Sequence, residues 1–143
     1  MATTDLERAI ERSHDALALI LKGDSGGYKA LFSQREDITL GNPFGPYARG
    51  RKKVEATLDG AASHYRDGQA TAADLIATYA SADLACVVEV EHGRAKVGGG
   101  PELVPIAARV TSLFRREQGE WRLVHRHADP ITTPRPAESV ISK

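Results

Sequence analysis

Four charged residues in the second half of the chain could do acid–base or electrostatic chemistry: Glu89, Glu91, Arg109 and Arg126. Glu89 and Glu91 are two residues apart, so an extended strand would place both carboxylates on one face. If such side chains are buried, they must pair with each other or with an ionic ligand, because an unpaired charge away from water is costly. The set therefore predicts either a structural ion-pair cluster or a polar pocket for a small carboxylate or similarly polar ligand. In an enzyme, Glu89 or Glu91 could serve as the base and Arg109 or Arg126 as the electrostatic stabiliser.

Two histidines near the end of the chain, His125 and His127, are also two residues apart. On a strand they share a face and could ligate a metal ion. Two ligands do not make a site, and no third ligand is spaced to join them. We expect no metal and no cofactor, and we favour packing and hydrogen bonding for both histidines.

Composition excludes several classes of protein. Hydrophobic residues make up 41% of the 143 residues, and 19 Lys and Arg balance 19 Asp and Glu. A nucleic-acid-binding protein usually carries a basic surplus, so no nucleic-acid partner is expected. No stretch approaches the roughly 20 apolar residues of a membrane span. The lone Cys86 requires no oxidising compartment, and the first residues lack a signal peptide's apolar core, so we expect a cytoplasmic protein without a membrane partner.

The elements that would position these residues follow from hydrophobic spacing and turn signals. Apolar residues at three- and four-residue intervals predict helices over 5–22, 27–33 and 51–67. Alternating or continuous apolar runs predict strands over 37–40, 71–80, 83–92, 104–117 and 119–129, with 41–46 as a fixed loop. Helices first and strands afterwards predict an α+β fold, with three N-terminal helices on a curved, largely antiparallel sheet. We expect a single domain over 1–130 and a proline-containing tail over 131–143.

The hairpin that closes the chain sorts its residues into two faces. If Glu117 lies opposite Glu120, Thr111 faces Arg126 across the two strands. One face then carries Val110, Phe114, Trp121, Leu123, His125 and His127, and the other carries Arg109, Thr111 and Arg126. Hydrophobic burial alone favours the Trp121 face under the helices. The pattern by itself leaves open which face they cover.

Several local strings resemble the SnoaL-like and ketosteroid-isomerase-like branch of the nuclear transport factor 2-like superfamily. They are the strings at 28–32 (YKALF), 37–45 (DITLGNPFG), 49–51 (RGR) and 119–127 (GEWRLVHRH). The last is the most specific, because Gly-x-Trp-x-x-x-His-x-His closes many members. The resemblance implies a cone of helices around a curved sheet, a pocket between them, and dimerisation through the outer sheet face.

The resemblance also implies which hairpin face lines the pocket. Ketosteroid isomerases place a pocket acid at the position matching Thr111, and association domains of calmodulin-dependent kinases place pocket arginines at those matching Thr111 and Glu91. The implied pocket therefore comprises Asn42, Phe44, His64, Tyr65, Glu89, Glu91, Arg109, Thr111 and Arg126. The implied homodimer interface comprises Val88, Val90, Val110, Phe114, Trp121, Leu123, His125 and His127.

The familiar isomerase chemistry needs a carboxylate base and buried acids that hold an oxyanion. At the matching positions this chain has Asn42, Ala16 and Thr111, none of which is an acid. Steroid isomerisation by that route is therefore not expected. We expect a homodimer that binds a small polar organic ligand. The alternatives are an isomerase, cyclase or dehydratase with a non-standard Glu/Arg pocket, and a non-catalytic dimerisation module.

Overall fold

The computed structural model describes residues 4–143 and has the predicted α+β architecture. The helices are α1 (Asp5–Ile20), α2 (Gly26–Leu31) and α3 (Arg51–Ser63), with a short 3-10 helix η1 (Ala137–Val140). The strands are β1 (Thr39–Asn42), β2 (Gly45–Arg49), β3 (Tyr65–Ala80), β4 (Leu84–Val97), β5 (Val104–Glu117) and β6 (Glu120–Asp129). They form one sheet in the order β2-β1-β6-β5-β4-β3. Every pair is antiparallel except β1 with β6.

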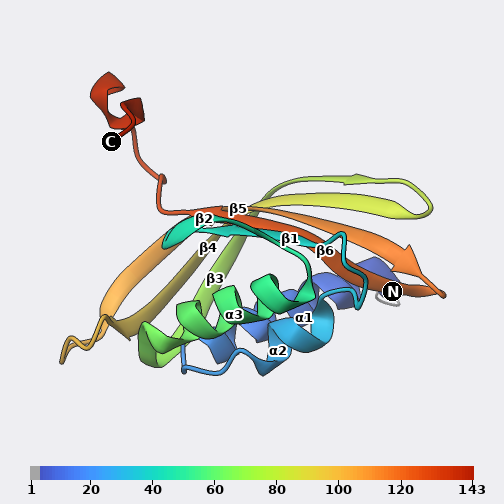
Figure 1. The fold of residues 1–143 in the computed structure, drawn as a ribbon, viewed down its shortest axis with the longest axis horizontal. Helices are drawn as coiled ribbons and strands as arrows, with labels where there is room; N and C mark the ends of the chain where they lie inside the picture. Colours follow the sequence, from blue (N-terminus) through green and yellow to red (C-terminus); the bar gives the residue numbers. More distant parts are fainter. Residues whose placement is uncertain (1–3) are drawn as a thin grey trace.

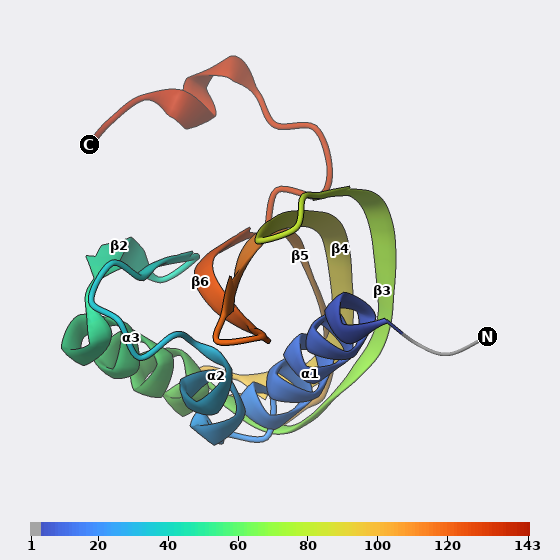
Figure 2. The same ribbon diagram turned by 90° about the vertical axis from the view of Figure 1, so that its right-hand side faces the viewer.

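The three helices lie on one side of the sheet (Figure 1). Figure 2 shows the sheet curving around that side, so that helices and strands enclose the interior of the domain. The opposite face, called the outer face below, carries no helix (Figures 1 and 2). This arrangement confirms the predicted fold class.

Helix α1 presents a narrow buried stripe to the sheet. Ala9, Ser13, Ala16 and Ile20 are its buried residues, at three- and four-residue spacing. The hydroxyl of Thr4 accepts a hydrogen bond from the backbone N–H of Glu7 at 3.1 Å, which caps the helix. The helix is therefore fixed along its length against the sheet, and His14 lies beside the stripe.

Several element boundaries differ from the sequence-based expectation, and the largest differences follow the third helix: β3 begins at Tyr65 instead of residue 71, and β4 ends at Val97 instead of residue 92. The third helix ends at Ser63 instead of residue 67, because Tyr65 already pairs with Val97 of β4. Gly68 does not end a helix. A Cβ there would come within 2.6 Å of a backbone oxygen of β4, so only glycine fits this close approach.

The expected loop over 41–46 is instead the turn of a small hairpin between β1 and β2. The side chain of Asn42 accepts a hydrogen bond from the backbone N–H of Phe44 at 3.0 Å and closes that turn. Strand β2 was not predicted, because Gly45 and Pro46 at its start are typical of an irregular loop.

A β-bulge in the closing hairpin determines which residues face the helices. Glu117 lies opposite Glu120 and Phe114 opposite Leu123, as predicted, but the next pair is Leu113 with His125. Val124 is therefore an extra residue in β6, and the alternation of faces changes there. As a result Trp121 and Leu123 before the bulge, and Arg126 and Ala128 after it, are all buried on the helix side.

Residues 131–143 are exposed and extend away from the outer face (Figures 1 and 2). No helix within residues 4–143 is long and apolar enough to cross a membrane.

Candidate functional site

A cavity of about 420 Å³ lies between the helices and the inner face of the sheet. Its lining includes fully buried residues such as Tyr28 and Leu40 and exposed ones such as Phe44 and Pro130, so it opens to solvent beside the exposed residues. Only six of the 22 lining residues have polar side chains or a phenol: Tyr28, Asn42, Tyr65, Glu91, His92 and Arg126. The cavity is therefore mainly apolar, unlike the polar pocket expected from the sequence.

A buried ion pair in the cavity wall joins Arg126 and Glu91. The two guanidinium Nη atoms donate to both carboxylate oxygens, at 3.0 and 2.6 Å. Arg126 is 7% exposed and Glu91 is 3% exposed. Burial lowers the pKa of Arg126, but the charge of Glu91, the hydrogen bonds to it and the nearby Tyr28 and Glu89 together outweigh burial and raise this pKa above its ordinary value. Arg126 is therefore a permanent cation, and it has further N–H donors beyond the two that bind Glu91.

Tyr28 of α2 lies beside this pair. The guanidinium carbon of Arg126 is 5.0 Å from the centre of the Tyr28 ring, which is cation–π distance. The Tyr28 hydroxyl is buried and has no hydrogen-bond partner among the described residues. Burial raises the pKa of Tyr28 well above its ordinary range, so the phenol remains neutral and keeps its proton. The cavity wall thus contains a neutral, buried hydroxyl donor that has no acceptor among residues 4–143.

Glu89 also faces inward but has a different partner. It is 2% exposed, and one of its carboxylate oxygens lies 2.9 Å from Nε2 of His14 on α1. The hydrogen bond to Glu89 raises the pKa of His14 above 6.5, while burial and the charge of Arg126 oppose this shift. Glu89 does not line the cavity. His14 was not among the residues that the sequence predicted for the site.

Four of the expected pocket residues lie near the opening. Asn42, Phe44 and Tyr65 line the cavity, whereas His64 packs against Phe44 with ring centres 4.5 Å apart. The rings of Phe44 and Tyr65 are 6.0 Å apart and meet edge to face. Together the aromatic rings form one side of the opening.

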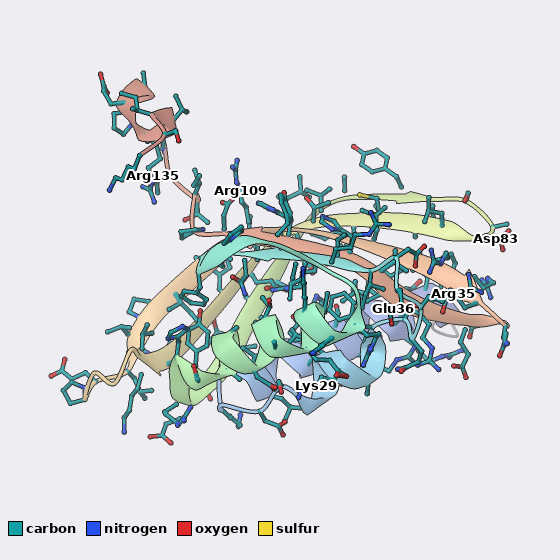
Figure 3. The ribbon with its side chains drawn as sticks, in the orientation of Figure 1. Lys29, Arg35, Glu36, Asp83, Arg109 and Arg135 are labelled. Atoms are coloured by element: carbon teal, nitrogen blue, oxygen red, sulfur yellow. The ribbon has the colours of Figure 1, made fainter. Side chains whose placement is uncertain are left out.

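Two expected pocket residues do not reach the cavity. Arg109 stands on the outer face (Figure 3), is bound to Asp129 at 2.7 Å, and is exposed. Thr111 also faces outward, because it alternates with the buried Val110 and Ser112 on β5. The bulge at Val124 in β6 makes its partner His127 instead of Arg126. The expectation that Arg109 and Thr111 line the pocket is therefore wrong. The acid position that the resemblance assigned to Thr111 is likewise not in the cavity.

The expected dimer interface is split between the two faces of the sheet. Val110, Phe114, Trp121 and Leu123 belong to the hydrophobic core and are at most 4% exposed, so they cannot form an outer interface. Val88 and Val90 alternate with buried Glu89 and Glu91 on β4 and therefore face outward.

His125 and His127 also face outward. Nδ1 of His125 is hydrogen-bonded to Thr39 at 2.7 Å, and His127 contacts both Tyr47 and Asp129 at 3.0 Å. Among residues 4–143, no three His, Cys, Asp or Glu side chains form a group that could hold a metal ion.

Ala16 and Asn42 occupy the two other positions at which the familiar isomerase chemistry needs an acid. Ala16 is buried in α1 at 1% exposure, and the Asn42 side chain is engaged in the turn between β1 and β2. Neither residue can transfer a proton.

The model of the SnoaL-like domain family matches residues 7–132. The chain belongs to this family. No curated protein sequence matches this SnoaL-like domain.

Solved structures share the fold of this SnoaL-like domain at low sequence identity. A nuclear transport factor 2-like protein from Salmonella enterica serovar Typhimurium is 18% identical, with a TM-score of 0.74 and 94% of each chain covered. A ketosteroid isomerase-like protein from Erwinia carotovora atroseptica is 20% identical, with a TM-score of 0.72 and coverage of 89% of this chain and 94% of that one. A candidate dehydratase from Streptomyces avermitilis is 21% identical, with a TM-score of 0.71 and coverage of 90% and 95%. These likenesses establish the nuclear transport factor 2-like fold.

Proposed function

We propose that this SnoaL-like domain binds a small organic molecule with an apolar body and one oxygen-bearing end. The observation that carries the proposal is the Tyr28 hydroxyl, which is buried without a partner next to Arg126 in a mainly apolar cavity. A buried donor without an acceptor is costly, and a ligand oxygen would remove that cost. The apolar walls would contribute most of the binding free energy by removing hydrocarbon surface from water.

Arg126 supports the same orientation of the ligand. Its two bonds to Glu91 leave N–H donors that can approach a ligand oxygen without breaking the ion pair. A carbonyl or hydroxyl group directed toward Arg126 and Tyr28 would place the rest of the molecule against the leucines and alanines of the walls.

Two naphthalene probes of similar size test this proposal. Naphthalene-2-carboxamide carries the oxygen, and 2-methylnaphthalene lacks it. We expect the carboxamide to bind more tightly in a fluorescence titration, and we expect Tyr28→Phe to weaken only the carboxamide, by about threefold to tenfold, the effect of one net hydrogen bond.

Tyr47→Phe is the matched control, because it removes a phenol hydroxyl on the outer face, where Tyr47 contacts His127. Equal affinity of the two probes for the wild-type domain, or equal weakening by the two variants, would refute the proposed orientation.

A second candidate function is proton transfer, as in an isomerase, cyclase or dehydratase. The observation that favours it is the placement of a carboxylate, Glu91, and a neutral phenol, Tyr28, in one cavity wall. Glu91 would act as the base, while Tyr28 and Arg126 would stabilise the developing oxyanion. Glu89 and Arg109 have no role in this mechanism, because neither lines the cavity.

Hydrogen exchange in deuterated water tests this second candidate. The probe is 2-acetylnaphthalene, whose methyl hydrogens are adjacent to a carbonyl, and loss of the methyl signal is followed by NMR. Exchange that is accelerated by the wild-type domain and by Glu120→Gln, but not by Glu91→Gln, would support the mechanism. The side chain of Glu120 is exposed and forms an ion pair with Arg122, away from the cavity lining. Acceleration by Glu91→Gln at the wild-type rate would exclude Glu91 as the base.

A further inference from the structure

Among residues 4–143, the buried charged side chains are two carboxylates, Glu89 and Glu91, and one permanent cation, Arg126. Glu89 and Glu91 lie on the same face of β4 and are 2% and 3% exposed. Arg126 on β6 binds both oxygens of Glu91. Glu89 is bound instead by His14, whose side chain is 33% exposed and so connects this interior cluster to solvent.

The formal charge of this four-residue cluster depends on His14 alone. With a protonated imidazole, the two carboxylates and two cations sum to zero. With a neutral imidazole, the sum is −1. The charged groups that act on His14 are Glu89 and Glu91 from β4 and Arg126 from β6, and their net effect raises the pKa of His14 above 6.5.

We propose that the His14–Glu89 pair determines the charge class of the ligand: neutral molecules bind irrespective of the state of His14, and deprotonation of His14 favours cationic over anionic ligands. This proposal rests on the ligand site proposed above, because Arg126 and Glu91 of the cluster line the same cavity. His14 and Glu89 do not line it and are positioning residues that act through the field of the cluster. A simple carboxylate ligand is disfavoured at alkaline pH, because it would add a negative charge to a buried set that already has an excess of one.

The expected size of the effect follows from Coulomb's law. At an effective dielectric constant of about 20, one unit charge changes the binding of another about 10 Å away by roughly tenfold. Loss of the His14 proton should strengthen the binding of a cation and weaken the binding of an anion, each by roughly tenfold. The ratio of their affinities should therefore change by about a hundredfold. A neutral ligand should change far less.

Three naphthalene probes of matched shape test the proposal on the full chain. They are naphthalene-2-carboxamide, 2-naphthoate and (2-naphthylmethyl)ammonium, titrated from below pH 6.5 upward. The protonation state of His14 is followed in the same samples by NMR, with its imidazole signal assigned by comparison with His14→Gln. This assignment separates His14 from His92, the histidine that lines the cavity and is bound to Asp74.

Three variants separate the cluster from other titrating groups. His14→Gln removes the titrating group and keeps a hydrogen-bond donor toward Glu89. Glu89→Gln removes one negative charge and should return the pKa of His14 toward 6.5. His125→Gln is the control, because it removes a histidine on the outer face.

The proposal is supported if the ammonium-to-carboxylate affinity ratio rises with the same midpoint as the His14 signal, in the wild-type domain and in His14-intact His125→Gln. Loss of that rise in His14→Gln, and a shift of the rise to lower pH in Glu89→Gln, support it further. A ratio that stays constant through the titration of His14, or that follows another group, overturns it while leaving the ligand site standing. If none of the probes binds at any pH, the ligand site itself is refuted. The wild-type titrations decide between these outcomes even if Glu89→Gln or His125→Gln fails to fold.

Discussion

Removing the Tyr28 hydroxyl should stabilise the domain, although Tyr28 is among the most buried residues of the core. The residue is 2% exposed and its hydroxyl has no partner among the described residues. Burial of a hydroxyl without a hydrogen bond costs about 1–3 kcal/mol by mutational data. Tyr28→Phe keeps the ring, its packing and its contact with Arg126, and it removes only the unpaired group. The free energy of unfolding should therefore rise by about 1 kcal/mol or more.

Urea denaturation of the ligand-free domain, analysed by linear extrapolation, measures this change. Tyr47→Phe is again the matched control, because Tyr47 is 66% exposed and its loss should alter stability by less than about 0.5 kcal/mol. If Tyr28→Phe instead lowers the free energy of unfolding by more than about 1 kcal/mol, the hydroxyl already makes a stabilising hydrogen bond within the domain. It would then not be an unpaired donor for a ligand oxygen.

Three further predictions concern the ion pair, the histidine and the outer face. Arg126→Met should lower the free energy of unfolding by about 3–5 kcal/mol, because it leaves Glu91 buried without a partner. The double variant that also carries Glu91→Met should recover most of that loss. Urea denaturation that shows an equal loss for the single and the double variant would contradict this prediction. The hydrogen bond between His14 and Glu89 raises the pKa of His14, so its contribution to stability is fully present below pH 6.5 and is lost as the pH rises through the raised value. Thermal melts of His14→Gln should lack that decline, and a decline equal to that of the wild-type domain would exclude His14 as its source. We also predict that the domain forms a homodimer through its outer face, and that Val88→Lys dissociates it in light scattering, whereas a wild-type monomer at micromolar concentration would refute the dimer.

Much of the fold could be predicted because local signals agree with it. The stripe of the first helix and the alternation in the strand that holds Glu89 and Glu91 each specify one buried face. The inward placement of the two glutamates followed from that alternation together with the resemblance. The structure places both of them there.

The side chains that were assigned to the wrong face of the sheet were misplaced mainly because of the bulge at Val124. Without a bulge, strict alternation forces Trp121 and Arg126 onto opposite faces, so either choice of face misplaces half of the strand. The bulge buries both residues, and its position depends on packing across the sheet, which no local pattern encodes. Arg109 and Thr111 were misplaced for the same reason.

The bond between His14 and Glu89 could not be predicted for a different reason. It joins residues 75 positions apart, and its formation depends on how the first helix crosses the sheet. Sequence spacing within a single element contains no information on such a contact.

A crystal structure of the domain with naphthalene-2-carboxamide tests the central claim most directly. Our account predicts that the ring system lies in the apolar cavity and that the amide oxygen lies within hydrogen-bonding distance of Tyr28 Oη or an N–H of Arg126. An amide that points to solvent at the Phe44 opening, or a probe that binds outside the cavity, would contradict it.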